Sequence, residues 1–176
     1  RPAAPAWRRR EFLQAAGAMA ALGAAGAPAA PAEKPMPQIR IGKHTLSRLI
    51  CGNNPFGAGS HLSTFVNQEM RRYFTPEQVL KTLRRCEEVG ITTWQSSLGC
   101  LELYRRHVAE GGKMQFLAIE TCAPEVIEKL AKGGCIGIAH HGEATDHLFK
   151  EGKLDQIHDR LKRVRDAGLL VGVSTH

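Results

Sequence analysis

The side chains best suited to chemistry in this sequence stand where short apolar segments end. Glu120 closes one such segment, His140 and His141 close the next, and His176 follows a third. A carboxylate and neutral imidazoles are ligands that divalent transition metals prefer, and the same groups act as general acids and bases. We therefore predict Glu120, His140 and His176 as catalytic groups, and the same three as ligands if a divalent metal is bound.

A second set of polar side chains has the character of substrate-binding groups. Asn53 and Asn54 follow the apolar segment 47–52, and Gln95 lies near the end of the segment after it. Amides donate and accept hydrogen bonds without carrying a charge. We expect Asn53, Asn54, Gln95 and His141 to bind a small polar substrate. If His140 and His141 continue one strand, only one of them faces its centre, and the alternation leaves open which.

The elements that must position these residues alternate between strands and helices. Thr75, Pro76 and Gln78 form a strong helix start, with an N-cap, a proline in the first turn and a capping box. The expected strands are 47–52, 91–97, 115–121, 135–140 and 169–174, preceded by a hairpin at 38–46. The expected helices are 76–89, 101–110, 124–131 and 154–167. Strict alternation of this kind predicts right-handed β-α-β units and a parallel sheet.

The architecture that fits this pattern is a (β/α)8 TIM barrel. No glycine-rich dinucleotide fingerprint follows any expected strand, which disfavours a doubly wound nucleotide-binding fold. A complete barrel takes roughly 250 residues, and residues 38–176 supply a little over half of one. We expect an N-terminal portion of about five strands and four helices, truncated at the C-terminus. Barrel active sites lie at the carboxyl ends of the strands, where the residues above would gather on one rim.

The N-terminal segment has the features of an export signal. Three arginines at 8–10 precede Glu11, Phe12-Leu13 and a weakly apolar stretch of Ala and Gly, which resembles a twin-arginine signal. That stretch is too short and too weakly apolar for a membrane span, which needs about 20 apolar residues. We predict a signal peptide at 1–32, a linker at 33–37 and the barrel domain at 38–176. The twin-arginine translocation machinery would deliver the protein to the periplasm or beyond the cell, and an uncleaved tether is the alternative.

Composition narrows the classes of function. The net charge of +7 is spread in short basic pairs, and aromatic residues, 6% of the chain, do not interleave with them, which disfavours nucleic-acid binding. The five cysteines are scattered, without a Cys-x-x-Cys pair, which predicts small core residues rather than a disulfide framework. The remaining histidines in helices and loops are expected at the surface: His44, His107, His147 and His158.

The first part of the expected barrel resembles the opening of aldo/keto reductases. The resemblance starts with the hairpin and strand 41–49 (Ile-Gly-Lys-His-Thr-Leu-Ser-Arg-Leu), followed by Gly52 and by Pro55-Phe56-Gly57. It continues with the helix at Thr75-Pro76 and with 88–92 (Glu-Val-Gly-Ile-Thr), and covers about 39–140. The resemblance implies a TIM barrel, a carbonyl substrate and an NAD(P) cofactor bound by later strands.

The catalytic tetrad of that family is not retained. The family has an Asp where this chain has Gln95, a Tyr where it has Cys100, and a Lys at the strand that ends in Glu120. His140 alone matches its counterpart. Tyr104 lies mid-helix, without the Asp and Lys that would lower the pKa of its phenol, so hydride transfer lacks its proton donor.

These observations predict an exported barrel enzyme acting on a small sugar-like or carbonyl substrate, with metal-assisted isomerase, lyase or hydrolase chemistry as one form. The alternatives are an NAD(P)-linked oxidoreductase of the aldo/keto reductase type and a non-catalytic binding barrel. The cofactor is left open between a divalent metal and NAD(P).

Overall fold

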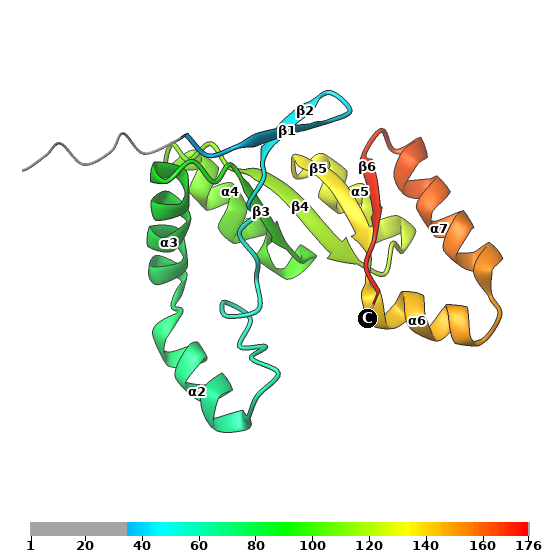
Figure 1. Cartoon of the computed structure of the whole chain (residues 1–176), viewed down its shortest axis with the longest axis horizontal. Helices are drawn as coiled ribbons and strands as arrows, with labels where there is room; N and C mark the ends of the chain where they lie inside the picture. Colours follow the sequence, from blue (N-terminus) through cyan, green and yellow to red (C-terminus); the bar gives the residue numbers. More distant parts are fainter. Residues whose placement is uncertain (1–34, 176) are drawn as a thin grey trace, which may run out of the picture. The chain divides into compact units, whose positions relative to one another are not determined.

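The computed structural model describes residues 35–175 and shows an α/β fold built on a parallel sheet (Figure 1). The chain enters through an antiparallel hairpin of β1 (Gln38–Ile41) and β2 (His44–Ser47). Gly42 turns the hairpin with a positive φ of 58°, a conformation that glycine adopts without strain. The hairpin predicted at 38–46 is confirmed.

Four parallel strands follow, in the spatial order β3-β4-β5-β6. Their bounds are β3 (Thr93–Ser96), β4 (Gln115–Glu120), β5 (Cys135–His140) and β6 (Leu170–Val173). Sequential strands are therefore neighbours in the sheet, the commonest arrangement for consecutive β-α-β units. The β5 prediction is confirmed to the residue, and the other three are confirmed with shorter ends.

The helices lie in the connections between the strands. Their bounds are α2 (Thr64–Tyr73), α3 (Pro76–Glu88), α4 (Leu101–Ala109), α5 (Pro124–Lys132), α6 (Gly142–Lys150) and α7 (Leu154–Asp166), with a 3₁₀ turn η1 (Leu98–Cys100) before α4. Helices α3, α4, α5 and α7 cover one side of the sheet, whereas α2 lies away from it (Figure 1). The Thr75 side chain accepts a hydrogen bond from the Gln78 amide, and Pro76 occupies the first turn, as the sequence predicts.

Three expectations about the elements are wrong. The strand predicted at 47–52 is reduced to one parallel bridge, between Cys51 and Trp94, because the hairpin ends at Ser47 and a turn begins at Asn53. The strict alternation also missed α2 and α6. The prediction placed one helix in each connection, whereas the β2–β3 connection holds α2 and α3 and the β5–β6 connection holds α6 and α7.

The apolar core lies between the sheet and its helices. Trp94, Phe116 and Ile138 project from three strands into it, and each is at most 1% exposed. Tyr104 of α4 stacks on Phe116 with ring centroids 4.8 Å apart, and Trp94 meets Phe116 edge-on at 5.5 Å. Burial raises the pKa of Tyr104, which fits a core residue.

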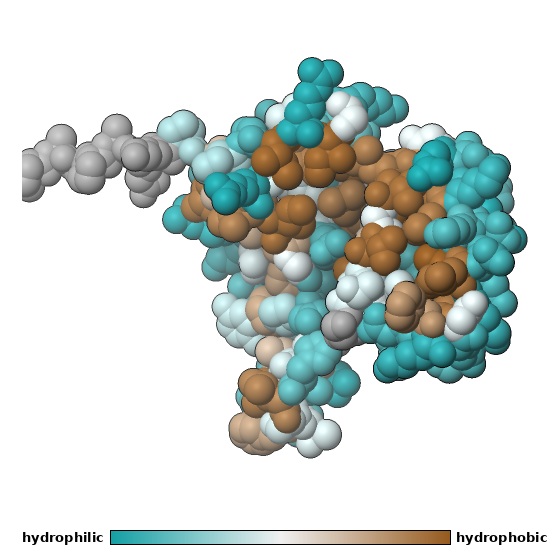
Figure 2. Space-filling model, turned by 45° about the vertical axis from the view of Figure 1, so that its right-hand side comes forward, coloured by the Kyte–Doolittle hydropathy of each residue, from teal (hydrophilic) through white to brown (hydrophobic). Residues whose placement is uncertain are grey.

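The opposite face of the sheet is open among the described residues. The hairpin lies against its amino end, where the Gln115 side chain donates to the Thr45 carbonyl oxygen (2.7 Å) and the Ser47 amide donates to Thr92 Oγ1 (2.9 Å). A shallow hollow of about 180 Å³ runs along this face, and its lining includes Leu46, Leu117, Ala139, Leu170 and Gly172. Figure 2 shows apolar residues exposed across this part of the surface, with polar residues along its right-hand border.

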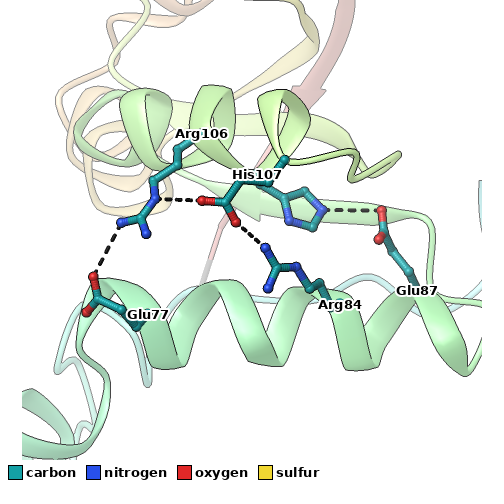
Figure 3. A network of polar contacts seen from close by, with 6 residues as sticks. Glu77, Arg84, Glu87, Arg106 and His107 are labelled. Atoms are coloured by element: carbon teal, nitrogen blue, oxygen red, sulfur yellow. Dashed lines mark hydrogen bonds and ion pairs between the residues drawn. The ribbon is translucent and has the colours of Figure 1, made fainter.

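A polar network joins α3 to α4 (Figure 3). The Glu110 carboxylate receives Arg106 at 2.9 Å and also Arg84, and Arg106 reaches Glu77 at 3.3 Å. Hydrogen bonding to Arg106 holds the pKa of Glu110 below its usual range.

The surface position predicted for His107 is wrong. Its ring is fully buried, and Nε2 lies 3.2 Å from Glu87 Oε1, which also accepts the Lys113 amide. A Cβ at Gly112 would stand 2.2 Å from Nε2, so only glycine fits beside the ring. His107 therefore has a structural role in the buried interior rather than a position at the surface.

Within residues 35–175, no helix combines the length and the apolar character needed to traverse a bilayer.

Candidate functional site: a polar cleft at the carboxyl edge of the sheet

A cleft of about 480 Å³ opens at the carboxyl ends of β3, β4 and β5. Three separate segments form it: the turn after the Cys51 bridge, the end of β3, and the β4–β5 edge. Its lining residues are Gly52, Asn53, Asn54, Pro55, Gln95, Ser96, Ser97, Ile119 and His141. The structure thus brings together all four residues that the sequence predicts as substrate-binding.

Backbone hydrogen bonds hold the turn that carries the two asparagines. The Asn53 carbonyl oxygen accepts the Gly57 amide (2.9 Å), and the Asn54 carbonyl oxygen accepts the Gly59 amide (2.8 Å). Ala58 and His61 both have a φ of 56°, in the left-handed region that non-glycine residues seldom adopt. The turn is therefore a fixed structure rather than an extended loop.

Each asparagine side chain is engaged by the protein at one end. Asn53 Oδ1 accepts the thiol of Cys100 at 3.6 Å, and Asn54 Nδ2 lies 3.2 Å from His61 Nε2. An amide nitrogen can only donate, so His61 Nε2 accepts in this arrangement. Asn53 keeps its Nδ2 hydrogens and Asn54 keeps its Oδ1 available for another partner.

Two polar side chains at the end of β3 point to opposite sides of the sheet. Ser96 is 4% exposed, and within the described residues its Oγ has no hydrogen-bond partner. Gln95 points to the open face of the sheet, since it lines both the cleft and the apolar hollow. The Ser96 side chain lies on the same side of β3 as Trp94, and its Oγ is enclosed by protein, so Gln95 is the residue whose side chain this strand presents to the cleft.

His141 is the one titratable side chain that lines the cleft, and its backbone is firmly held. Its amide donates to the Glu120 carbonyl oxygen (2.9 Å), and its carbonyl oxygen accepts both the amide and the hydroxyl of Thr145 (2.8 and 2.9 Å). The exposed imidazole also borders a second hollow of about 540 Å³, lined by Thr121, His141, Glu143, Ala144 and His147.

Glu120 and His140 do not line this cleft. Glu120 pairs with His140 across β4 and β5, and both share the helix-facing side with Ala118 and Ile138. Glu120 Oε1 accepts the Leu98 amide at 2.6 Å, at the start of η1. The structure thus places both side chains on the helix-facing side of the sheet, and the catalytic role of Glu120 and His140 stays a prediction.

The hydrogen bonds of His140 define its tautomer. The Thr145 hydroxyl donates to the His141 carbonyl oxygen, so at 2.6 Å from His140 Nδ1 it accepts. Nδ1 therefore carries the proton, and Nε2 accepts from the Arg160 guanidinium at 3.1 Å. Burial, with Arg160 and His141 adding to it, lowers the pKa of His140 and keeps the imidazole neutral.

A metal centre at these residues stays a prediction. Both ring nitrogens of His140 are engaged, and His176, the third predicted ligand, lies outside the described residues. Among residues 35–175, no three His, Cys, Asp or Glu side chains are grouped so as to hold a metal ion.

The positions that correspond to the aldo/keto reductase tetrad have other roles in this structure. Cys100 donates to Asn53, Glu120 supports η1, and Tyr104 is packed in the core. Gln95 is the one of these positions that lines the cleft. The tyrosine that would donate a proton in that family thus has no counterpart among the described residues that line the cleft.

The site predicted from the sequence did not include Ser96, Ser97 or Ile119 as lining residues, and it assigned no role to His61. Ser96 and Ser97 directly follow Gln95, so their position at the end of the strand already indicated that they lie at the rim. The contact of His61 with Asn54 depends on left-handed backbone at His61, which no local sequence pattern announces.

Comparison with known proteins adds no assignment. No protein-family model matches the chain, and no curated protein matches it significantly. The geometry of the cleft is therefore the main evidence for a function.

Proposed function

We propose that the protein is a TIM-barrel enzyme resembling aldo/keto reductases, which acts on a small sugar-like or carbonyl substrate in the polar cleft. The observation that carries the proposal is the convergence of Asn53, Asn54, Gln95 and His141 on one cleft, from segments up to 88 positions apart in the chain. Convergent polar groups in a concave site at the carboxyl edge of a parallel sheet favour a ligand-binding role.

The open face of the sheet supports closure into a barrel. Leu117, Ala139 and Leu170 lie along an uncovered apolar hollow, and the hairpin lies against the amino end of the same face. Strands with apolar residues on both faces are typical of sheets that are covered on both sides, as in (β/α)8 barrels. Further strands would pair with the free edge of β6 and cover this face.

The chemistry within the cleft would depend on His141, because its imidazole is the one side chain of general acid–base type among the described lining residues. An imidazole beside amides and hydroxyls suits proton transfer at a carbonyl or hydroxyl carbon, as in an isomerase or lyase. NAD(P)-linked reduction is the second candidate, favoured only by the resemblance of residues 39–140 to aldo/keto reductases.

Two measurements on the protein, purified without chelators, separate these forms. A near-stoichiometric divalent metal that is lost in His176→Ala supports metal-assisted chemistry. Saturable binding of NADPH, followed by fluorescence, supports the oxidoreductase. If the protein binds neither, and turns over none of a panel of aldoses, ketoses and polyols, the enzyme proposal fails and a binding barrel replaces it.

We also propose export by the twin-arginine pathway, with cleavage after Ala32; residues 1–32 lie outside the described part of the chain. The double change Arg9→Lys and Arg10→Lys should retain the protein in the cytoplasm, because the receptor reads the arginine pair. Fractionation with N-terminal sequencing checks this. Arg48→Lys and Arg71→Lys serve as controls, and unchanged export of the double variant would contradict the proposal.

A further inference from the structure

The lining of the cleft carries hydrogen-bonding groups but no formal charge from Lys, Arg, Asp or Glu. Its polar side chains are three amides, two hydroxyls and one imidazole, beside the apolar Pro55 and Ile119. A phosphate or carboxylate ligand is normally met by a guanidinium or ammonium group. The lining of this cleft contains neither a guanidinium nor an ammonium group for such a ligand.

The two asparagines present complementary groups from adjacent positions. The Cys100 thiol occupies Asn53 Oδ1, which leaves the Nδ2 donor, and His61 occupies Asn54 Nδ2, which leaves the Oδ1 acceptor. A hydroxyl group is both donor and acceptor, so neighbouring hydroxyls on one ligand can satisfy both amides.

Ser96 does not add a ligand-binding group to this set. The residue borders the cleft, but its side chain lies on the same side of β3 as Trp94, and its Oγ is enclosed by protein. The groups exposed to a ligand are therefore the amides, the Ser97 hydroxyl and the His141 imidazole.

We propose that the cleft selects an uncharged, hydroxyl-rich ligand, and that Cys100 and His61 are positioning residues that orient the Asn53 and Asn54 amides toward it. This proposal rests on the proposed function, since it takes the cleft to be the substrate site. It adds the charge class of the substrate and two residues that the predicted site did not include.

Gly52 offers a way to block the cleft without disturbing the fold. It lines the cleft, its backbone is not left-handed, and a Cβ built there has no other atom within 4 Å. Gly52→Val should therefore occlude the cleft and leave folding intact. Gly99→Val is the matched control, because Gly99 is exposed near the same rim, is not among the lining residues, and its Cβ would meet only Ser97 Oγ at 3.7 Å.

The test measures binding of three probes of one carbon skeleton by calorimetry: sorbitol, sorbitol 6-phosphate and gluconate. We expect sorbitol to bind at least tenfold more tightly than either anion. Gly52→Val should abolish that binding and Gly99→Val should preserve it, with circular dichroism confirming that both fold.

Two further variants test the positioning residues. Cys100→Ala should weaken sorbitol binding about fivefold, the equivalent of one ordinary hydrogen bond, and Cys100→Ser, which restores a donor, should recover it. His61→Ala should weaken binding to a similar extent. Equal affinities of wild type, Cys100→Ala and His61→Ala would overturn their positioning role.

The outcomes distinguish an error in the charge class of the ligand from an error in the position of the site. If an anionic probe binds more tightly than sorbitol and Gly52→Val still abolishes binding, the cleft is the site and the inference about charge is wrong. If no probe binds, or if binding survives Gly52→Val, both the inference and the proposed role of the cleft fail.

Discussion

The helix-facing side of the β3–β6 sheet and the cleft at its carboxyl edge differ in how far their polar side chains are engaged by the protein. On the helix-facing side, His140 has both ring nitrogens bonded, and Glu120 accepts a backbone amide at 2.6 Å. In the cleft, Asn53 and Asn54 each keep one end of the side-chain amide available, and Gln95 borders the cleft from the open face. The imidazole and carboxylate on the helix-facing side thus support the fold, whereas the amides of the cleft are available to a ligand.

This difference teaches that residue type alone does not locate a site. An imidazole whose hydrogen bonds are all made within the protein has little left to offer a substrate. An amide or hydroxyl without a partner beside a cleft has its full capacity available. The predictions below test this contrast, beginning with the largest expected effect.

The largest effect should come from the apolar residues of the two faces. Phe116→Ala should lower the free energy of unfolding by about 3–5 kcal/mol, because its fully buried ring contacts Trp94 and Tyr104. Leu117→Ala, on the open face, should lower the free energy of unfolding by clearly less than Phe116→Ala does. Urea denaturation of both variants checks the contrast. Equal losses of unfolding free energy would contradict the conclusion that Leu117 lies on an uncovered face.

The adjacent histidines should separate stability from binding. His140→Ala should destabilise the protein by about 1–3 kcal/mol, since Arg160 and Thr145 lose a buried partner. His141→Ala, at an exposed position, should change stability by no more than about 0.5 kcal/mol but weaken ligand binding in the cleft. Denaturation and calorimetry check both variants. A loss of stability in His141→Ala together with a loss of binding alone in His140→Ala would contradict the roles assigned to the two residues.

The lowered pKa of His140 predicts a pH dependence with a definite sign. Its cause is first burial, then the charges of Arg160 and His141. Between the folded pKa and the unfolded value near 6.5, the unfolded chain binds more protons, so stability should fall as the pH drops through this range. Urea denaturation at several pH values should show a smaller fall in His140→Asn. An identical pH dependence in wild type and variant would assign the effect to other groups.

Ser96→Ala should have little effect on stability or on binding. Removing a buried hydroxyl that has no partner among the described residues should leave the protein equally stable or slightly more stable, by less than about 1 kcal/mol. Because the Ser96 side chain lies on the helix-facing side of β3, ligand binding in the cleft should be unchanged. A marked loss of stability in thermal denaturation would show that the hydroxyl has a partner within the protein.

Much of the fold could be predicted from the sequence, because its signals are local. The cap at Thr75 and Pro76 and the apolar run of β5 each define an element without help from the rest of the chain. Helices α2 and α6 were not predicted, because strict alternation allows one helix between successive strands, and these two are the additional helices of connections that also hold α3 and α7.

The candidate site could be predicted only in part. The turn at Asn53 and Asn54 and the strand end at Gln95 indicated the rim correctly, because strand ends of a parallel sheet meet at one edge. The directions of Glu120 and His140 could not be predicted, since both faces of these strands carry apolar residues and the alternation does not say which face the helices cover.

The most direct test of the cleft as a ligand site is a titration with sorbitol followed by the side-chain amide signals in ¹H–¹⁵N spectra. We predict that the amide signals of Asn53, Asn54 and Gln95 shift together and saturate at one affinity, while the side-chain signal of Trp94, buried on the helix-facing side, stays in place. Shifts confined to other residues, or none at saturating sorbitol, would contradict the account.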